Sequence, residues 1–500
     1  MPQKSQTGPL HIGGVRTALY NYLFAKKQGG KMVLRIEDTD QKRFVDGAED
    51  YILESLNWCG IEFDEGVHKG GPYGPYKQSD RKAHYEEYAK KLISSGHAYY
   101  AFDTPEELEA LRKKLETEKA LNTSYGPHCR SEMDNSLTLN EKKVNQKISS
   151  GEPYVIRFKM PENEDVNFTD IIRGDVVVNT STLDDKVLFK SDGMPTYHLA
   201  NIVDDYLMKI SHVIRGEEWL PSLPLHVLLY KALGWENEMP QFAHMPLTLK
   251  PDGKGKLSKR DGDRLGFPVF PLEWKNPQTG EISSGYRESG YFPEAFINIL
   301  AFLGWNPGTE QEIFSMEELI QTFSLERVGK AGSRFDPEKA KWYNHQYLIE
   351  KDNLELAELY QPILKEKGII KNIQFVERVV GLIKERANFV QEFWDQSSFF
   401  FEAPMEYDAK MISKGWKENT TEILKAFLSK SEDLEEYTFD NIELAVKSVL
   451  EEKGIGMGQL MMPLRLVLVG SGKGPGVIEI MEFLGKEEVK RRIEKACNSR

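Results

Sequence analysis

The sequence predicts an α/β domain that is interrupted by an α+β module and followed by an all-α C-terminal region. Helix and strand patterns alternate over residues 1–102 and again over residues 187–250. Short strand patterns mark the stretch between them, and strand patterns nearly vanish after Pro293. A chain of 500 residues is long enough for about three domains, each with a sizeable core.

The first predicted elements are a glycine-containing turn, a helix and a strand. His11 precedes Gly13 and Gly14, and the run that follows places Val15, Leu19, Tyr22 and Leu23 on one side of a helix. This helix is predicted to stop at Gln28-Gly29-Gly30, and the apolar alternation of residues 31–37 predicts a strand. Such a turn is typical of the phosphate-binding half of a Rossmann-type fold, because bare backbone lets a phosphate approach the positive end of the helix. The imidazole of His11 could donate a hydrogen bond to charge that develops on the phosphate.

The other α/β elements follow in order along the chain. Helices are predicted over residues 46–56 and 79–97, and Thr104 with Pro105 marks the start of a charged helix. Residues 154–160 and 168–178 predict the strands of the inserted module. The α/β pattern then resumes with strands at 187–190 and 212–215 and helices at 197–205 and 223–233.

The C-terminal half is predicted to be mainly helical. Residues 268–291 are rich in proline, glycine and aromatic residues, which predicts a surface excursion. Beyond Pro293, apolar residues recur at helical spacing, with one face formed by Phe375, Val379, Leu382 and Ile383 and another by Ile478, Met481 and Leu484. The glycine-rich stretch 470–476 lacks the Gly-Lys-Ser/Thr ending of a phosphate loop, so we interpret it as a loop that leads into a helix.

Composition narrows the function classes. The formal net charge is −13, so any contact with nucleic acid must use local basic patches rather than the whole surface.

The three cysteines, Cys59, Cys129 and Cys497, are widely spaced, and His128 beside Cys129 lacks further clustered ligands. This spacing favours free thiols over zinc or a disulfide. We find neither a signal peptide nor an apolar run of membrane-spanning length, and we therefore expect a cytoplasmic protein.

A second candidate phosphate-binding segment is Lys256-Leu257-Ser258-Lys259-Arg260. It lies in a loop without apolar periodicity, for which a solvated basic surface is the common alternative. Mobile lysines near a triphosphate stabilise the charge that forms during attack at the α-phosphorus. Combined with the turn at His11, this favours the functional interpretation.

These two segments resemble the HIGH and KMSKS signature sequences of class I aminoacyl-tRNA synthetases, and the closer match is the bacterial glutamyl-tRNA synthetase family. The segment from Thr7 to Gly14 resembles the first signature, with Gly14 in place of its last histidine. Further blocks that resemble this family, in its order, are Arg35–Asp40, Pro195–Asn201, Arg215–Trp219, Trp342–Gln346 and Met462–Arg465. The resemblance covers nearly the whole chain.

The resemblance implies ATP-dependent attachment of L-glutamate to tRNA through a glutamyl-adenylate, with AMP and pyrophosphate as products. His11, Lys256 and Lys259 would be catalytic. The ATP-binding residues would be His11, Gly13, Gly14, Glu218, Trp219, Lys256, Ser258 and Lys259. The glutamate-binding residues would be Ser5, Glu37, Tyr197, Asn201 and Arg215. Mg²⁺ would accompany ATP, and neither zinc nor another metal held by the protein is expected.

The same resemblance assigns roles to the predicted domains. Residues 1–102 and 187–250 would form the two halves of the Rossmann-type catalytic domain, and 103–186 an inserted acceptor-binding module. Residues 251–330 would hold the KMSKS-like loop and a stem-contact region, and 331–500 the all-α anticodon-binding region. The partners would be tRNA for glutamate, L-glutamate and ATP, with a monomeric chain and no membrane. Whether tRNA for glutamine is also charged stays open.

Simpler roles compete with these assignments. Arg215 could form a salt bridge with Glu217 or Glu218, and Tyr197 could serve helix packing alone. Asp38 and Asp40 more simply fix a turn than bind a metal. The competing functions are the shorter paralogue that glutamylates a base in a tRNA anticodon, a glutaminyl-tRNA synthetase, a small nucleotidyltransferase and a non-catalytic tRNA-binding protein.

One departure from the family lies at the start of the sequence. Family members carry a strand and an Arg-Phe-Ala-Pro-Ser-Pro segment there, whose arginine contacts glutamate. Residues 1–6 read Met-Pro-Gln-Lys-Ser-Gln, so that only the serine matches. We expect that the sequence lacks a short N-terminal piece, or is altered there, and that its activity is impaired.

Overall fold

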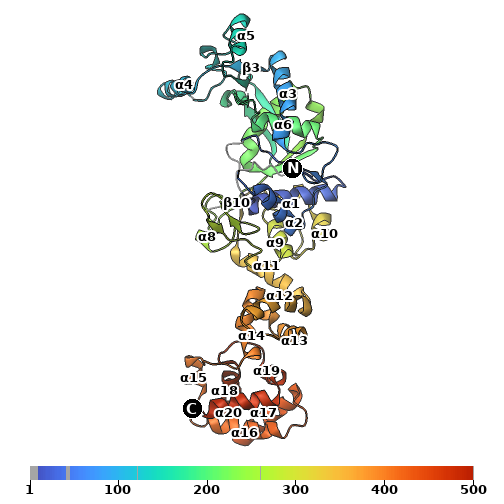
Figure 1. Ribbon diagram of the computed structural model, residues 1–500, viewed down its shortest axis with the longest axis vertical. Coiled ribbons are helices and arrows are strands. Elements are labelled where there is room, and N and C mark those ends of the chain that lie inside the picture. Colours follow the sequence, from blue (N-terminus) through green and yellow to red (C-terminus); the bar gives the residue numbers. More distant parts are fainter. Residues whose placement is uncertain (1–8, 41–44, 121, 259–260, 499–500) are drawn as a thin grey trace. The chain divides into compact units, whose positions relative to one another are not determined.

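The computed structural model describes residues 9–40, 45–120, 122–258 and 261–498. The chain divides into an N-terminal unit, Met1–Ala340, and a helical unit, Lys341–Arg500 (Figure 1). The expected roles of Ser5 and of the first six residues lie outside the described residues, as do Lys259 and Arg260. Among the described helices, none combines the length and the apolar character that a membrane span requires.

The first helix forms as its sequence predicts. Helix α1 (Ile12–Lys27) starts after His11 and ends at Gln28, where Gly29 follows with a positive φ of 64°. The strand expected over residues 31–37 contains only β1 (Val33–Leu34), which pairs in parallel with β2 (Glu65–Gly66). All residues from 32 to 38 are buried, so this segment has no solvent-facing side and its polar residues must find partners inside the protein.

The main sheet places the candidate site. Its strand order is β6 (Gly174–Asn179), β5 (Asp165–Asp170), β9 (Gln241–Met245), β8 (His212–Gly216), in which β9 runs parallel to both β5 and β8. Helix α1 is attached to this sheet because Asn21 Nδ2 donates to the carbonyl of Ile214, at 2.9 Å. Helices α3 (Lys82–Ser94), α6 (Tyr197–Leu207) and α7 (Leu223–Ala232) complete the core around the sheet. The carboxyl ends of β8 and β9 therefore meet at one edge, where α/β folds bind their ligands.

A second sheet belongs to the inserted module. It is antiparallel, in the order β3 (Ala98–Ala101), β4 (Val155–Phe158), β7 (Val187–Phe189). Two of its strands thus come from outside the expected range 103–186, whereas β5 and β6 lie inside that range and join the main sheet. Helices α4 (Pro105–Thr117) and α5 (Glu141–Ser149) lie with β3 at one end of the N-terminal unit (Figure 1). Thr104 caps α4 with Pro105 at the first helical position, as its sequence predicts, and it also forms a capping box with Glu107.

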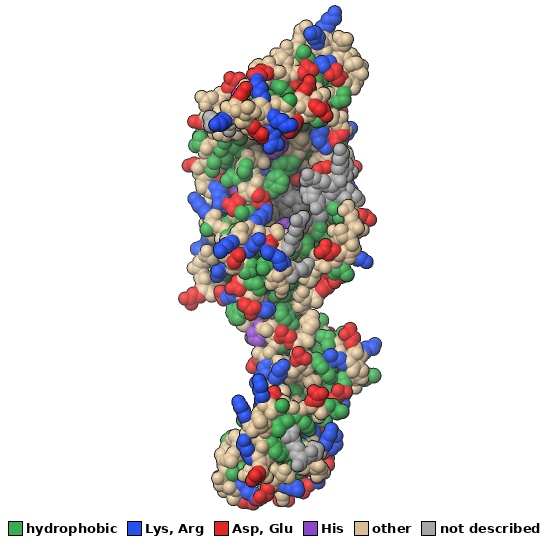
Figure 2. Space-filling model, turned by 90° about the vertical axis from the view of Figure 1, so that its left-hand side faces the viewer, with side chains coloured by type: hydrophobic (Ala, Val, Ile, Leu, Met, Phe, Trp, Pro, Cys, Tyr) green, Lys and Arg blue, Asp and Glu red, His purple; other side chains and the backbone are tan. Residues whose placement is uncertain are grey.

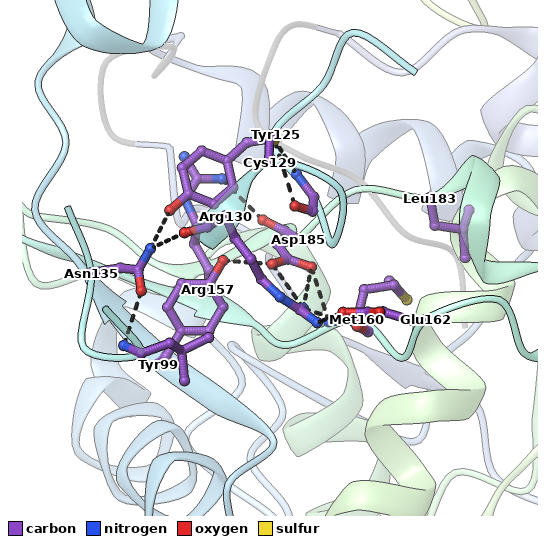
Figure 3. Close-up of polar contacts among 12 residues, drawn as sticks. Tyr99, Tyr125, Cys129, Arg130, Asn135, Arg157, Met160, Glu162, Leu183 and Asp185 are labelled. Atoms are coloured by element: carbon purple, nitrogen blue, oxygen red, sulfur yellow. Dashed lines mark hydrogen bonds and ion pairs between the residues drawn. The ribbon is translucent and has the colours of Figure 1, made fainter. Parts of the chain in front are cut away.

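A buried carboxylate organises the module (Figure 3). Asp185, which is fully buried, accepts hydrogen bonds from the hydroxyl of Tyr99 at 2.5 Å and from the backbone amide of Met160 at 3.0 Å. Arg130 Nη1 lies 3.2 Å from the same carboxylate. The guanidinium of Arg157 stacks 4.1 Å above the ring of Tyr125. The buried apolar cluster of this region is small, so these polar contacts contribute to holding the module together.

The segment after the main sheet is more buried than expected. Strand β10 (Thr248–Leu249) pairs with β13 (Ser333–Arg334), and β11 (Trp274–Lys275) pairs with β12 (Ile282–Ser283). The surface excursion expected at 268–291 is wrong, because Val269, Phe270, Leu272 and Tyr286 are all buried. The other helices of this unit are α2 (Ala48–Trp58), α8 (Gly262–Leu265), α9 (Pro293–Ala301) and α10 (Met316–Thr322).

The expected all-α range 331–500 begins with strand β13, and from Pro337 onward the described secondary-structure elements are all helices. Helix α11 (Pro337–Glu350) precedes α12 (Asn353–Glu366), α13 (Ile373–Ile383), α14 (Phe393–Phe401), α15 (Ala409–Gly415), α16 (Thr420–Glu432), α17 (Phe439–Lys453), α18 (Met457–Val469), α19 (Val477–Leu484) and α20 (Lys486–Asn498). The glycine-rich stretch 470–476 joins α18 to α19, and Arg465 donates to its carbonyl groups. Its interpretation as a loop that leads into a helix is confirmed, and so is the fold class.

Candidate active site

The histidine before α1 is held by the helix that it caps. His11 Nδ1 accepts a hydrogen bond from the amide of Gly13 at 3.0 Å. A Cβ at position 13 would lie only 2.9 Å from His11 Cε1, which explains the glycine there. Because Nδ1 accepts, the proton of the neutral ring is on Nε2. The ring thus combines a donor nitrogen with the positive end of a 16-residue helix, an arrangement suited to an anion.

Three hydrogen bonds connect α1 to the segments around it. The amide of Ile12 donates to the carbonyl of Val269 at 2.9 Å. Arg16 donates through Nη2 to the carbonyl of Pro246 at 2.5 Å and through Nη1 to that of Leu303 at 2.7 Å. Pro246 directly follows β9, so Arg16 ties the histidine-bearing helix to the end of the main sheet.

The lysine-rich loop is attached to strand β10 at Lys256 and Leu257. Lys256 forms an isolated antiparallel β-bridge with Leu249, and Leu257 is buried and donates its amide to the carbonyl of Thr248. Lys256 Nζ lies 2.6 Å from Glu218 Oε1, with both side chains about half exposed. Burial raises the pKa of Glu218, but the hydrogen bond from Lys256, a backbone hydrogen bond and the positive charges of Lys256 and Arg16 together hold this pKa below its ordinary value.

Ser258 stabilises the conformation of the same loop. Its hydroxyl and its amide both donate to Asp261 Oδ2, at 2.6 Å and 2.9 Å. Lys250 and Arg264 also pair with this carboxylate. The hydrogen bonds from Ser258 hold the pKa of Asp261 well below its ordinary value. Asp261 therefore stays ionised, and its carboxylate connects Lys250 and Ser258 with Arg264.

Arg215 and Tyr197 meet at the end of β8. Arg215 is 1% exposed, and its Nη1 donates to the hydroxyl of Tyr197 at 2.5 Å. Its Nε donates to His244 Nε2 at 2.9 Å and its Nη2 to the carbonyl of Trp219 at 3.4 Å. The rings of Tyr197 and Trp219 pack with centroids 4.7 Å apart. The structure thus groups three of the predicted site residues around one buried cation.

The carboxylates proposed as simple partners for Arg215 have other partners. Glu217 pairs with Arg173 and also accepts a hydrogen bond from the amide of Leu247. Glu218 pairs with Lys256. Glu218 and Trp219 are neighbours in the short 3-10 helix Glu217–Ser222, so this turn joins the Lys256 pair to the Arg215 group.

Glu37 belongs to a buried charge network that its sequence pattern did not reveal. Arg35 Nη2 donates to Glu37 Oε1 at 2.8 Å, and Arg35 Nη1 donates to Asp205 at 2.9 Å. Burial raises the pKa of Glu37, against the opposing effect of Arg35. Asn201 is 1% exposed and lies one turn after Tyr197 on α6, on the same helix face. Asp38 accepts a hydrogen bond from the amide of Ser79, at 2.8 Å, and so links this segment to the start of the 3-10 helix Gln78–Arg81.

Four site residues were not predicted: Arg16, Arg35, Asp170 and His244. Strand β9 (Gln241–Met245), which carries His244, was not predicted: only its first residue is exposed and the other four are buried, so it lacks the alternation of exposed and buried residues that marks a strand. The sequence did offer one signal for the network at Glu37, namely an arginine and a glutamate two positions apart, Arg35 and Glu37, in a largely apolar segment.

The chain is similar to known proteins over nearly its whole length. The model of the family described as tRNA synthetases class I (E and Q), catalytic domain, matches residues 4–342, and that of the anticodon binding domain matches residues 355–497. The glutamate–tRNA ligase of Parabacteroides distasonis is 59% identical over 493 residues, which cover 98% of this chain and 97% of that protein. That of Flavobacterium psychrophilum is 60% identical, with the same coverage.

Two solved structures are also similar to this chain over nearly its whole length. A glutamate–tRNA ligase from Elizabethkingia meningosepticum, crystallised in complex with its amino acid, is 50% identical with a TM-score of 0.94 and covers 99% of this chain and 98% of its own. The glutamate–tRNA synthetase of Elizabethkingia anophelis is 51% identical with a TM-score of 0.92 and the same coverage. Because both family models fit in order and the similarity extends over nearly the whole chain, the protein belongs to the class I tRNA synthetases of the glutamate and glutamine group.

Proposed function

We propose that this chain is a glutamate–tRNA ligase. The carboxylate of L-glutamate attacks the α-phosphorus of ATP, pyrophosphate leaves, and the glutamyl group of the adenylate passes to the 3′ end of tRNA with release of AMP. The observation that carries the proposal is the Arg215–Tyr197 pair beside the Lys256–Glu218 pair. The first pair suits a carboxylate and the second suits phosphates, and one turn of chain connects them.

Glutamate is bound by the buried group at the end of β8. Arg215 pairs with a carboxylate of the substrate, because a guanidinium forms directed, charge-assisted hydrogen bonds. The hydroxyl of Tyr197 and the amide of Asn201 add polar contacts from α6, and Glu37 accepts the ammonium group. Ser5 contributes a contact on the basis of the family resemblance alone.

ATP is bound at the start of α1 and at the lysine-rich loop. His11 donates from Nε2 to the phosphates, and Gly13 and Gly14 let them approach the helix. Lys256 and Lys259 stabilise the charge of the pentacoordinate phosphorus, with Ser258 holding the loop. Glu218 and Trp219 border the adenosine. Mg²⁺ is bound as part of the nucleotide substrate.

Transfer RNA is bound by both units, each through local basic patches. Residues 103–186 receive the acceptor end, 251–330 contact the stem, and the helical unit holds the anticodon arm. Figure 2 shows lysine and arginine side chains along one edge of the helical unit, beside exposed apolar side chains. Such a surface suits phosphates and unstacked bases. We propose a monomer that works in the cytoplasm, with tRNA for glutamate as substrate and tRNA for glutamine as a second substrate to be tested.

The decisive experiment is ATP–pyrophosphate exchange with each amino acid, with and without tRNA, followed by charging of purified tRNAs. We expect exchange with glutamate alone and charging of tRNA for glutamate at its 3′ end. Exchange with glutamine would favour a glutaminyl enzyme. Modification of an anticodon base would favour the shorter paralogue, and absence of exchange under all conditions would favour a non-catalytic tRNA-binding protein.

A further inference from the structure

A completely buried histidine lies behind the proposed glutamate site. His244 is 0% exposed on β9 and stands directly opposite Arg215 of β8 in the parallel register. Its Nδ1 lies 2.6 Å from Asp170 Oδ2, at the end of β5, and its Nε2 lies 2.9 Å from Arg215 Nε. Three adjacent strands thus supply a carboxylate, an imidazole and a guanidinium in one line, which continues to the hydroxyl of Tyr197.

The hydrogen-bond chemistry permits one proton arrangement for this line. An arginine N–H donates and cannot accept, so His244 Nε2 must present its lone pair to Arg215. The ring proton is then on Nδ1 and is donated to Asp170. The carboxylate of Asp170 is itself fixed, because its Oδ1 accepts from the amides of Ile172 and Arg173, at 3.0 Å and 2.8 Å.

The pKa directions agree with that arrangement. Burial raises the pKa of Asp170, but hydrogen bonds from His244 and from the backbone outweigh it and keep the pKa below its ordinary value. Burial lowers the pKa of His244, against the opposing effect of Asp170. An ionised Asp170 beside a neutral His244 is the state that the geometry requires.

We propose that His244 and Asp170 are positioning residues, which fix the plane of the Arg215 guanidinium for the carboxylate of the substrate. This inference rests on the proposed function, in which Arg215 binds glutamate. Asp170 sets the tautomer of His244, and His244 holds the Nε side of Arg215 while Tyr197 contacts Nη1. The guanidinium is thereby oriented in advance, which spares the ordering cost that a mobile side chain would incur on binding.

Three variants separate positioning from mere packing. His244→Phe keeps the ring shape and removes the acceptor, whereas His244→Gln keeps an acceptor oxygen near the place of Nε2. Asp170→Asn keeps an oxygen for the amides of Ile172 and Arg173 but offers an N–H to His244. The ring must then carry its proton on Nε2, where it opposes the N–H of Arg215. His212→Phe is the matched control, since His212 is a half-buried histidine at the other end of β8.

The readout is ATP–pyrophosphate exchange, with the KM for glutamate and the KM for ATP determined separately. For His244→Phe and Asp170→Asn we expect the KM for glutamate to rise by about 10- to 100-fold, the scale of one lost buried hydrogen bond to a charged group, with the KM for ATP within about twofold. His244→Gln should recover most of the loss, and His212→Phe should leave both constants unchanged.

Several outcomes would overturn the inference. An unchanged KM for glutamate in His244→Phe would show that Arg215 needs no such support. Equal losses in His244→Gln and His244→Phe, or a KM for ATP that rises as much as that for glutamate, would indicate a packing role only. If the parent chain shows no glutamate-dependent exchange, the proposed function fails and the positioning role fails with it, whereas a normal parent with unaffected variants refutes the positioning role alone.

Discussion

Lys256 Nζ lies 2.6 Å from Glu218 Oε1, so an ion pair joins the lysine-rich loop to the turn that follows β8. Both side chains are about half exposed, and a pair of this kind contributes about 0–1 kcal/mol to stability. Lys256 can therefore leave Glu218 for a phosphate at little cost. In the proposed function, the pair would keep Lys256 close to the phosphates and still let it bind them.

The first prediction concerns Lys256→Met. We expect the rate of ATP–pyrophosphate exchange to fall by about 10²-fold or more, because a positive charge beside the phosphates is lost, while the melting temperature stays nearly unchanged. Lys254→Met is the control, since Lys254 is an exposed lysine of the same loop. Equal rates in the two variants would contradict the role given to Lys256.

The second prediction concerns Lys259→Ala. Its charge matters most when the α-phosphorus is pentacoordinate, so the loss should fall on the transition state. We expect adenylate formation to slow by about two to four powers of ten, with glutamate affinity little changed. A single-turnover measurement of adenylate formation at saturating ATP checks this, and a normal rate there would remove Lys259 from the reaction.

Long periodic elements and ordered motifs were predictable from the sequence. Helix α1, the capping box at Thr104 and the helices of the C-terminal region follow from local spacing and capping chemistry, which tertiary contacts did not override. The resemblance to a family depends on seven short blocks in order, and that order assigned Arg215 and Tyr197 to one site before their contact could be known.

Non-local pairing was not predictable. The strands β3 and β7 join one sheet across an insertion, and no local pattern encodes which strands pair. The aromatic residues of 268–291 face the core rather than solvent, because the backbone of Val269 packs against the start of α1. The position of His244 beside the candidate site is visible only through its contacts with Asp170 on β5 and Arg215 on β8.

The third prediction concerns the buried carboxylate of the inserted module. Tyr99→Phe removes the hydrogen bond to Asp185 and leaves a buried charge with one donor fewer. We expect the free energy of unfolding to fall by about 1–3 kcal/mol in urea titrations. Tyr100→Phe is the control, as Tyr100 is the half-buried neighbour of Tyr99 on the same strand. Equal stability of the two variants would show that the Asp185 network adds nothing.

The fourth prediction concerns the helical unit. A chain that ends at Asp336, just before α11, should keep the N-terminal fold but lose efficient charging, because the anticodon arm has no binding surface. Its circular dichroism and melting curve verify folding. Binding of tRNA to the full chain should weaken steeply with salt, since phosphate contacts release counterions. Charging by the shortened chain with unchanged kcat/KM would refute the two-part assignment.

The fifth prediction concerns pH and His198, whose Nδ1 lies 3.3 Å from Nε2 of the buried His226. Burial lowers the pKa of His198 from 6.5 to about 4, with a smaller contribution from Lys186. Between these two values the unfolded chain binds a proton that the folded chain does not, so stability falls as the pH drops from 7 to 5. His198→Gln removes the titrating imidazole while keeping a polar side chain toward His226. Between pH 7 and pH 5, we therefore expect the free energy of unfolding to fall by about 1–2 kcal/mol more in the native chain than in His198→Gln, as measured by chemical denaturation. Parallel losses in the two proteins would mean that His198 is protonated, or accessible to protons, in the folded state.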